Sequence, residues 1–379
     1  MNLSLGKEKI SLIIEKTVNH SKLNYSKKKV QKAGESLIIE NISKNNPDVY
    51  KESMLILSNW RASHVYSLHN ITSLVHKIAI KEDRKVIIAK RLKRTPSIVN
   101  KLRRFETMKL RNMQDIAGCR AILSTNKNVY KVFRKLNKTR EFKVTDYIKF
   151  PKDDGYRGIH LVCKCGDGEH GEKGAQYPVE IQLRSKTQHS WATAVEIVDL
   201  FTNQTLKSNE GKKDWLDFFK YISHEFSKLE NIDNKLVDNS MSESIRLIKK
   251  LNIYKKFRAY AGSLKVIEDH VSNNAEGYNL IQINFEEKTL QVWSYPYSDF
   301  DKATLHYLNL EKEAEKDNKY VVALVSSKSI SNLREAYPNY FADSKLFIKH
   351  VREVELINNM KNPHWLLKWI TSAGLQSNN

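Results

Sequence analysis

The sequence predicts an α+β fold, in which helices flank a mixed and mainly antiparallel sheet, followed by a smaller α/β domain. Three observations indicate this. Apolar residues keep helical spacing over much of residues 45–110, short β-prone runs follow up to residue 183, and a second group of β-prone runs begins at residue 278. A chain of 379 residues also exceeds the usual size of one domain.

The first region is expected to be a helical prelude. The helical spacing covers residues 50–65 and is continued by the apolar residues of 86–92. Thr95 and Pro96 then look like the cap and first turn of another helix.

The sheet region is expected to hold four strands and one helix. The four runs are short and β-prone, and the helix has apolar residues at a period near 3.6. The expected strands are 119–123, 143–150, 159–165 and 177–183, and the expected helix is 128–136.

The second half divides into helices and a small sheet. Residues 212–265 form long, charge-rich amphipathic segments, and strands are expected at 278–285, 290–293 and 320–325. We therefore predict an α+β first domain with its prelude at 1–225, a helical connector at 226–273, and a C-terminal domain at 274–379.

The charge lies almost entirely in the first half. Residues 1–200 hold 39 Lys and Arg against 20 Asp and Glu, whereas residues 201–379 hold 25 against 23. So many unpaired cations predict an anionic partner for the first half, such as nucleic acid, a nucleotide or an anionic membrane. A lysine-rich solvated surface is the alternative for the segment before Lys90.

Cysteine usage and hydropathy predict a cytoplasmic protein that does not bind membranes. Three cysteines, Cys119, Cys163 and Cys165, are too few for a disulfide framework. Charges interrupt the apolar residues at the start before a signal peptide could form, and no run approaches the roughly 20 apolar residues of a membrane helix.

A first candidate site lies in KRLKRTPSIVNKL. Its cations crowd the start of a helix, where exposed backbone N–H groups also favour phosphate. The alternative is a solvated basic helix face. The residues are Arg91, Lys93, Arg94, Ser97 and Lys101.

A second candidate site pairs Asp115 with Glu180, each next to an apolar run that predicts a buried strand. Two carboxylates on adjacent strands repel each other unless a cation such as Mg²⁺ lies between them and reaches substrate phosphates. Ordinary ion pairs with Arg120 or Arg184 are the alternative.

A third candidate site is DYIKFPKDDGYRGIH. Glycines 155 and 158 give the backbone freedom around Tyr156, whose ring could then stack on a base. Lys152, Arg157 and His160 would meet phosphate or sugar oxygens. A hairpin turn with an exposed tyrosine is the alternative.

Together these stretches resemble the synthetase domain of the RelA/SpoT alarmone synthetase family over roughly residues 45–225. The matching motifs are RxKxxxSIxxK at residues 91–101, DIxGxR at 115–120, DYIxxPKxxGYRxxH at 146–160 and EIQLRxxxQHxWA at 180–192. One departure is Asp154, which stands where the usual synthetase has Asn.

The resemblance implies an enzyme that moves the β,γ-pyrophosphate of ATP to a ribose 3′-hydroxyl. It places Arg91 against adenine, with Lys93, Arg94, Ser97 and Lys101 on the ATP phosphates. It implies that Asp115 and Glu180 hold Mg²⁺, and that Tyr156 stacks on the acceptor base. Its supporting residues would be Arg120, Gln182 and Arg184.

The arrangement also resembles the CapRel-type fused toxin-antitoxin proteins, because a zinc-less C-terminal domain carries Tyr337 and Tyr340 in a YxxY motif. That resemblance implies pyrophosphorylation of the 3′ CCA end of tRNA, which stops translation. It also implies autoinhibition through the two tyrosines, relieved by a phage structural protein in antiviral defence. Core packing is the alternative for the tyrosine pair.

Two other functions stay open from the sequence. An ordinary synthetase that uses GDP or GTP to make (p)ppGpp offers Tyr156 a purine as well. A non-catalytic RNA-binding regulator is less favoured, because Asp115, Glu180 and the cations of the first site are all present.

Overall fold

The computed structural model describes residues 23–165, 177–202, 204, 206, 210–232, 237, 239–271, 277–284, 287, 289–316, 319–326 and 340–361. The chain forms two compact units. Unit 1 consists of Met1–Asp146 and Gly158–Ser185, and unit 2 consists of Tyr147–Arg157 and Lys186–Asn379.

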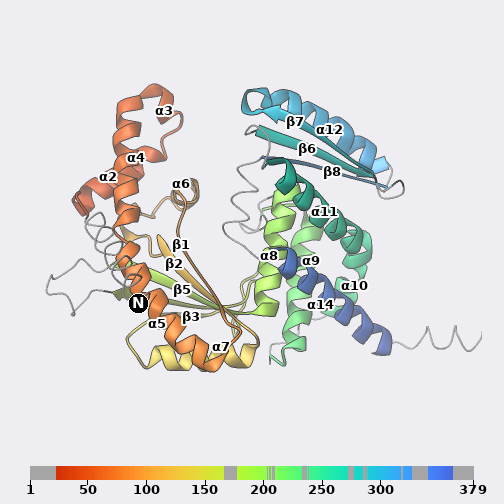
Figure 1. Ribbon diagram of the computed structural model, residues 1–379, viewed down its shortest axis with the longest axis horizontal. Helices are drawn as coiled ribbons and strands as arrows, with labels where there is room; N and C mark the ends of the chain where they lie inside the picture. The colour runs from red at the N-terminus through yellow and green to blue at the C-terminus, as the bar shows by residue number, and fades with distance from the viewer. Residues whose placement is uncertain are drawn as a thin grey trace, which may run out of the picture. The chain divides into compact units, whose positions relative to one another are not determined.

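Unit 1 contains a five-stranded sheet with helices around it (Figure 1). Its helical elements are α2 (Lys27–Leu37), α3 (Ile42–Asn45), α4 (Pro47–Ala62), α5 (Val65–Glu82), α6 (Thr95–Arg104), η1 (Leu110–Asn112) and α7 (Asn126–Asn137). Its strands are β1 (Ile87–Leu92), β2 (Ala117–Leu123), β3 (Lys143–Asp146), β4 (Ile159–Cys165) and β5 (Tyr177–Ser185).

The strand order is β1-β2-β5-β4-β3, and every neighbouring pair is antiparallel except β2 and β5. The predicted α+β class with a mainly antiparallel sheet is therefore confirmed. The parallel pair sets Gly118 opposite Glu180 and Arg120 opposite Gln182. Alternate residues of these two strands consequently share one face of the sheet.

One face of this sheet is apolar and is covered by α5 and α7, which lie together on one side of it in Figure 1. Cys119, Ile181 and Leu183 are buried there, and Thr72 of α5 forms a hydrogen bond with the Cys119 thiol. The intervening residues of β2 and β5 point to the other face. That second face carries five of the predicted site residues of unit 1.

The prelude differs from the sequence prediction at one point. Residues 86–92 were expected to continue the helix, but Ile87–Leu92 is strand β1. This strand pairs along its whole length with β2. Its strand conformation is therefore set by pairing with a distant part of the chain, which the local spacing of apolar residues does not reveal. The expected strand at 143–150 is also shorter, because β3 ends at Asp146.

A second buried cluster in unit 1 holds α2, α4, α6 and η1 together. Ile98 and Leu102 of α6 lie in it, four residues apart on one helix face, and Leu110 and Met113 anchor η1 in the same cluster. Both α6 and η1 are thus fixed by apolar contacts on one side, which leaves their other side to polar residues.

Unit 2 is a helical assembly with a three-stranded sheet. Its helices are α8 (Lys186–Thr202), α9 (Lys213–Leu229), α10 (Ser240–Lys250), α11 (Ile253–Val271), α12 (Phe300–Lys316) and α14 (Tyr340–Lys361), with the short η3 (Tyr297–Asp299). Its strands are β6 (Gly277–Asn284), β7 (Thr289–Pro296) and β8 (Tyr320–Ser326).

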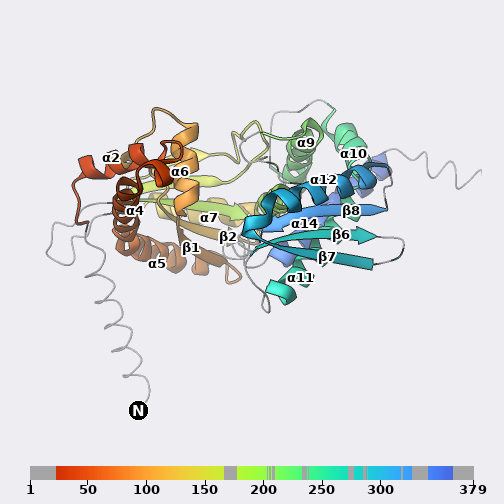
Figure 2. The same ribbon diagram turned by 90° about the horizontal axis from the view of Figure 1, so that it is seen from above.

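The three strands run antiparallel in the order β7-β6-β8, and Figure 2 shows α12 lying along them. The sequence predicted all three. The predicted connector at 226–273 and boundary at 274 stay predictions. In the structure, one hydrophobic cluster includes α8, α9 and α11 together with Ile281 of β6.

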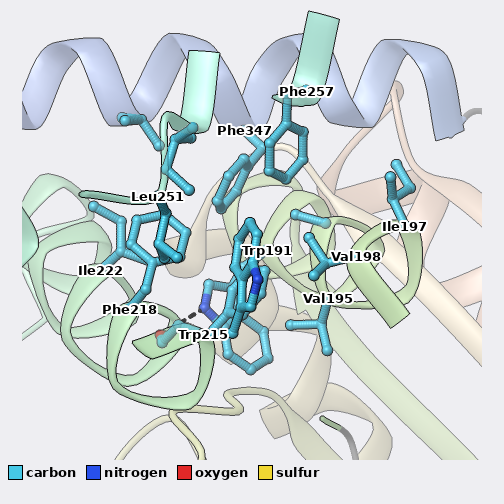
Figure 3. Close-up of a cluster of buried hydrophobic side chains, with 14 of the residues drawn as sticks. Trp191, Val195, Ile197, Val198, Trp215, Phe218, Ile222, Leu251, Phe257 and Phe347 are labelled. Atoms are coloured by element: carbon cyan, nitrogen blue, oxygen red, sulfur yellow. Dashed lines mark hydrogen bonds between the residues drawn. The ribbon is translucent and has the colours of Figure 1, made fainter. Parts of the chain in front are cut away.

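Helix α14 supplies the centre of that cluster (Figure 3). The Phe347 ring is fully buried, with its centroid 5.1 Å from Phe257, 5.5 Å from Phe226, 6.1 Å from Phe219 and 6.3 Å from Phe218. The end of the described chain is therefore an integral part of unit 2.

Among the described helices, none has the length and apolar character needed to cross a membrane.

We predict that Phe347→Ala lowers the free energy of unfolding by about 3–5 kcal/mol, because it leaves a cavity among four aromatic rings. Met360→Ala on the same helix is the control, since that side chain is 76% exposed and its loss should change stability by less than about 0.5 kcal/mol. Urea denaturation followed by tryptophan fluorescence measures both. Equal stability of the two variants would contradict the packing of α14 in unit 2.

Candidate active site

The polar face of the unit 1 sheet gathers five of the predicted site residues. Gln182 of β5 is paired in register with Arg120 of β2 and with His160 of β4. Its side-chain amide donates to Glu180 Oε2 (2.8 Å), and its Oε1 accepts from Arg184 Nη2 (3.0 Å) and Arg120 Nε (3.4 Å). Gln182 thus joins two guanidinium groups to one carboxylate.

Asp115 lies just before β2 and is held by two lysines. Its Oδ2 accepts from Lys93 Nζ at 2.9 Å and from Lys101 Nζ at 2.8 Å. The Lys93 backbone N–H donates to the Ile116 carbonyl at 2.7 Å, which fixes the end of β1 beside the start of β2. Two residues of the predicted ATP site therefore contact one of the predicted metal ligands.

Both carboxylates have lowered pKa values. Burial alone would raise the pKa of Glu180, but hydrogen bonds from His160 and Gln182 and the positive charges of His160 and Lys101 outweigh it, and the pKa falls to about 2. Burial likewise opposes ionisation of Asp115, yet Lys93 and Lys101 lower its pKa. Both groups are therefore ionised at neutral pH, as metal coordination or phosphate chemistry requires.

The donor set fits a Mg²⁺ site that is completed by substrate. Asp115 Oδ1 is buried and has no hydrogen-bond partner within the described part of the chain. The described residues hold no group of three or more His, Cys, Asp or Glu placed to bind a metal ion. Mg²⁺ usually takes one or two protein carboxylates together with water and substrate phosphates, so two carboxylates are enough.

The remaining residues of the predicted ATP site lie between β1 and α6. Arg91 is exposed on β1 opposite Gly118, and Arg94 is the N-cap residue of α6. Ser97 is exposed in the first turn of this ten-residue helix, whose N-terminal N–H groups favour anions. The structure thus places all five residues of the first predicted site on consecutive elements of unit 1.

Three predicted acceptor-binding residues, Lys152, Tyr156 and Arg157, belong to unit 2, whereas His160 belongs to unit 1. Lys152 Nζ lies 5.1 Å from the centroid of the Tyr156 ring and 4.9 Å from that of Tyr147. The Tyr156 ring is half-buried, with its centroid 6.5 Å from that of Trp191. One ammonium group therefore contacts two aromatic rings.

Backbone contacts hold the Tyr156 loop against α9. Gly155 has φ +91°, and a Cβ there would lie 3.0 Å from the Phe219 carbonyl oxygen and 3.0 Å from the Lys220 Cα. Only glycine fits this close approach without strain. The Ser223 hydroxyl donates to the Gly155 carbonyl, and the Asp154 carboxylate accepts from the Tyr156 N–H at 2.8 Å.

Arg157 is buried and makes contacts that fix this loop. Its Nη1 donates to the Ile148 carbonyl at 3.0 Å and its Nε donates to the Ser223 hydroxyl at 3.3 Å. The predicted contact of Arg157 with the acceptor stays a prediction. The sequence gives no sign of the Ser223 partner, which lies 66 residues further along the chain.

The sequence reasoning missed two contact sets. His160, predicted to meet the acceptor, donates from Nδ1 to Glu180 Oε1 at 3.0 Å, a contact that only the β4–β5 register reveals. His189 of the QHSWA stretch pairs through Nε2 with Asp343 of α14 at 3.2 Å. No local signal could connect residues 154 positions apart.

Tyr337 lies outside the described residues. Tyr340 is the first residue of α14, and its side chain lies outside the described part of the structure. Their predicted inhibitory role stays a prediction.

The contact between His160 and Glu180 predicts a pH dependence of stability. The pKa of Glu180 is lowered from 4.5 to about 2. The contribution of its ionised form to the free energy of unfolding is therefore fully present above pH 4.5 and is lost as the pH falls toward 2. We expect His160→Ala to raise this pKa and to cost about 1–3 kcal/mol near pH 7, since a buried carboxylate loses a donor. The difference from wild type should shrink between pH 4.5 and 2.

Urea unfolding at a series of pH values measures this difference. The exposed His76 on α5 gives a control, because His76→Ala removes an imidazole without touching Glu180. A constant difference between wild type and His160→Ala down to pH 2 would show that His160 does not lower the Glu180 pKa.

Comparison with known proteins shows that this site lies in a part of the chain that is similar to a known protein family. Residues 90–198 match the family model described as the region found in RelA / SpoT proteins. GTP pyrophosphokinase YwaC of Bacillus subtilis is 34% identical over 111 residues, which are 27% of this chain and 52% of that protein. A probable chloroplastic GTP diphosphokinase of Arabidopsis thaliana, RSH3, is 38% identical over 80 residues, which are 20% of this chain and 10% of that protein.

The chain thus spans about half the length of the first of these relatives and about a tenth of the second. Among solved structures, small alarmone synthetase 1 from B. subtilis bound to pppGpp is 23% identical, with a TM-score of 0.38. The similarity covers 44% of this chain and 89% of that one. A GTP pyrophosphokinase family protein from Streptococcus pneumoniae is 20% identical, with a TM-score of 0.39. That similarity covers 50% of this chain and 97% of the other.

The family match includes Arg91, Asp115, His160, Glu180 and Gln182, so the polar sheet face of unit 1 lies inside it. Residues 90–198 are therefore similar to the region found in RelA / SpoT proteins.

Proposed function

We propose that the protein is an ATP-dependent pyrophosphokinase, which transfers the β,γ-pyrophosphate of ATP to a ribose 3′-hydroxyl and releases AMP. The observation that carries this proposal is that two carboxylates, Glu180 on the polar sheet face and Asp115 just before β2, are ionised beside Lys93 and Lys101. The similarity of residues 90–198 to GTP pyrophosphokinases supports it.

The residues of unit 1 perform this transfer mainly by alignment and charge neutralisation, on which phosphoryl chemistry depends. Lys93, Lys101 and the N-terminus of α6 bind the triphosphate oxygens. Asp115 and Glu180 hold Mg²⁺, which supplies further neutralisation of the phosphate charge. Since Lys93 and Lys101 contact Asp115, they stay extended toward this carboxylate before ATP arrives.

The Gln182 network keeps the second carboxylate in place. His160 donates to one oxygen of Glu180 and Gln182 to the other, which leaves each oxygen a further lone pair for a metal ion. Arg120 and Arg184 hold the Gln182 amide in one orientation. The charges that face the pyrophosphate are thereby preorganised, which is the main way such sites lower an activation barrier.

We propose that the acceptor is the 3′-terminal adenosine of tRNA. Residues 1–200 hold 39 cationic and 20 anionic residues, and this excess of positive charge supports a polyanionic acceptor. The resemblance to CapRel-type proteins agrees with it. Tyr156 then stacks on the terminal base. The second candidate acceptor is GDP or GTP, favoured by the names of the B. subtilis and A. thaliana relatives.

We also propose that the C-terminal part of the chain restrains the enzyme through Tyr337 and Tyr340 until a phage structural protein releases it. The restraint requires a firm attachment of α14, and two polar contacts to α8 support one. Asp343 pairs with buried His189, and His350 Nε2 lies 3.3 Å from the Thr187 hydroxyl. Tyr340 begins the same helix.

The transfer is tested with γ-labelled ATP, Mg²⁺ and three acceptors in parallel: deacylated tRNA, GDP and GTP. We expect label on the 3′ end of tRNA, and none on a transcript without the terminal adenosine. Asp115→Asn and Glu180→Gln should each reduce transfer at least 100-fold, because either change leaves the metal with one carboxylate. Glu82→Gln is the control, since Glu82 pairs with Lys135 among the helices of the apolar face.

Label in ppGpp or pppGpp without label in tRNA would assign the chain to the GDP/GTP synthetases. Near-normal transfer by Asp115→Asn or Glu180→Gln would remove that carboxylate from the proposed metal site.

The restraint is tested in the full chain, because removal of α14 would also remove Phe347 from the core of unit 2. We expect Tyr337→Ala/Tyr340→Ala to raise the rate of transfer several-fold and to make expression toxic. Tyr297→Ala removes an exposed tyrosine of the same unit and should do neither. Equal rates for the double variant and wild type would rule out inhibition through this pair.

A further inference from the structure

One strongly basic surface of unit 1 lies outside the proposed ATP site. It occupies the last turn of α6, the loop after it and η1, and we name it the α6–η1 ridge. Residues 101–112 contain five cations and one acid, Glu106. The exposed residues that define the ridge are Arg103, Arg104, Phe105, Lys109 and Arg111.

The ridge is held rigidly from beneath. Ile98 and Leu102 bury one face of α6, and Leu110 and Met113 bury η1 in the same cluster. Gly34 of α2 closes this contact, because a Cβ there would lie 2.6 Å from the Leu110 Cβ. The exposed cations therefore project from a fixed platform rather than from a loose loop.

Three of the four ridge cations have no ion-pair partner among the described residues. Within the described part of the chain, no carboxylate forms an ion pair with Arg103, Lys109 or Arg111. These three cations lie on one short segment and repel one another, and a bound anion would relieve that repulsion. Their exposure points to an anionic partner that is large enough to touch both α6 and η1.

An exposed aromatic ring lies among these cations. Phe105 is 42% exposed, and the Arg104 guanidinium lies 4.7 Å from the centroid of its ring. An arginine over an aromatic ring offers a flat surface to an unpaired nucleobase, and the surrounding cations offer contacts to phosphates. A simple inorganic anion needs no such ring.

The ridge also continues directly from the proposed catalytic face. Lys101 contacts Asp115 at 2.8 Å, and Arg104 follows three residues later, about 4.5 Å further along the helix axis. A polyanion that lies on the ridge therefore has its end within reach of the residues that hold Asp115.

We propose that the α6–η1 ridge binds the sugar-phosphate backbone of RNA next to its 3′ end, an inference that rests on the tRNA acceptor proposed above. The cations neutralise backbone phosphates, and Phe105 contacts an unpaired base. A free nucleoside diphosphate is too small to use the ridge, so the surface discriminates between the two candidate acceptors.

The test compares two variants that lose the same charge from unit 1. The first is Arg103→Gln/Lys109→Gln/Arg111→Gln. The control is Lys127→Gln/Lys131→Gln/Lys138→Gln, whose lysines are exposed on or directly after α7, the helix that covers the apolar face of the sheet. Thermal unfolding confirms that both variants are folded.

Binding of deacylated tRNA is measured by filter binding at several salt concentrations. We expect the ridge variant to bind at least about tenfold more weakly and its salt slope to fall by about 3, one for each lost phosphate contact. The α7 variant should keep most of the wild-type affinity and slope. Phe105→Ala should weaken binding about fivefold or more with an unchanged slope, because stacking does not release counterions.

Transfer of label to GDP separates this inference from the proposed function. If the enzyme accepts GDP, the ridge variant should keep the wild-type rate with GDP while its rate with subsaturating tRNA falls about tenfold. A wild-type salt slope for the ridge variant would overturn the proposal that the ridge binds RNA. An equal loss of tRNA affinity in the α7 variant would overturn it as well. Competition by polyglutamate as strong as that by RNA would overturn it in favour of an acidic protein partner.

The experiments can reject RNA binding by the ridge while supporting the proposed tRNA acceptor, and they can also reject the acceptor while supporting the ridge. Transfer to tRNA with no effect of the ridge variant on binding rejects the ridge alone. Tight ridge-dependent tRNA binding with label only in ppGpp or pppGpp rejects the proposed acceptor, and leaves the ridge as an RNA-binding surface.

Discussion

The alternation of side chains along β5 is the constraint on which the site depends. Val179, Ile181 and Leu183 point to the apolar face, so Glu180 and Gln182 must point to the other. A slip of one residue in the pairing with β2 would bury a carboxylate beneath α5 and α7 and expose three aliphatic side chains. The free energy of core packing therefore also fixes the position of the chemically important groups.

The polar face is stable only as a network. Each of its carboxylates is largely removed from water, which by itself opposes ionisation, and each is compensated by at least two donors. Removal of one donor from such a network leaves a buried charge with less compensation, and this costs more than the lost contact alone contributes. The arrangement that supports phosphoryl chemistry is consequently sensitive to substitution of its supporting residues as well as of its carboxylates.

Much of unit 1 could be predicted because its strands carry a local signal. The apolar alternation at 159–165 and 177–183 located β4 and β5, and the parallel and antiparallel pairings then bring His160, Gln182 and Arg120 together. Strand β1 could not be predicted, since residues 87–92 have no alternation of their own and depend on β2 for pairing. Local pattern fixes which face a residue occupies but not which distant element covers it.

The same limit applies to the contacts that cross long stretches of sequence. Nothing near Arg157 indicates Ser223, and nothing near His189 indicates Asp343. Both contacts depend on how α9 and α14 pack, which is decided by the aromatic cluster around Phe347. Buried polar side chains whose partners lie this far away are the residues most easily misassigned to a ligand from sequence alone.

The segment Tyr147–Arg157 has a consequence for the order in which the protein is made. The chain leaves unit 1 after Asp146, contributes this segment to unit 2, and returns at Gly158. On the ribosome, the sheet strands up to Ser185 emerge before Phe219 and Ser223, against which the Tyr156 loop is held. Domains generally fold from the N-terminus onward during synthesis. The loop that carries Tyr156 therefore reaches its final form only after α9 has been made, so an incomplete chain carries the sheet without a finished loop.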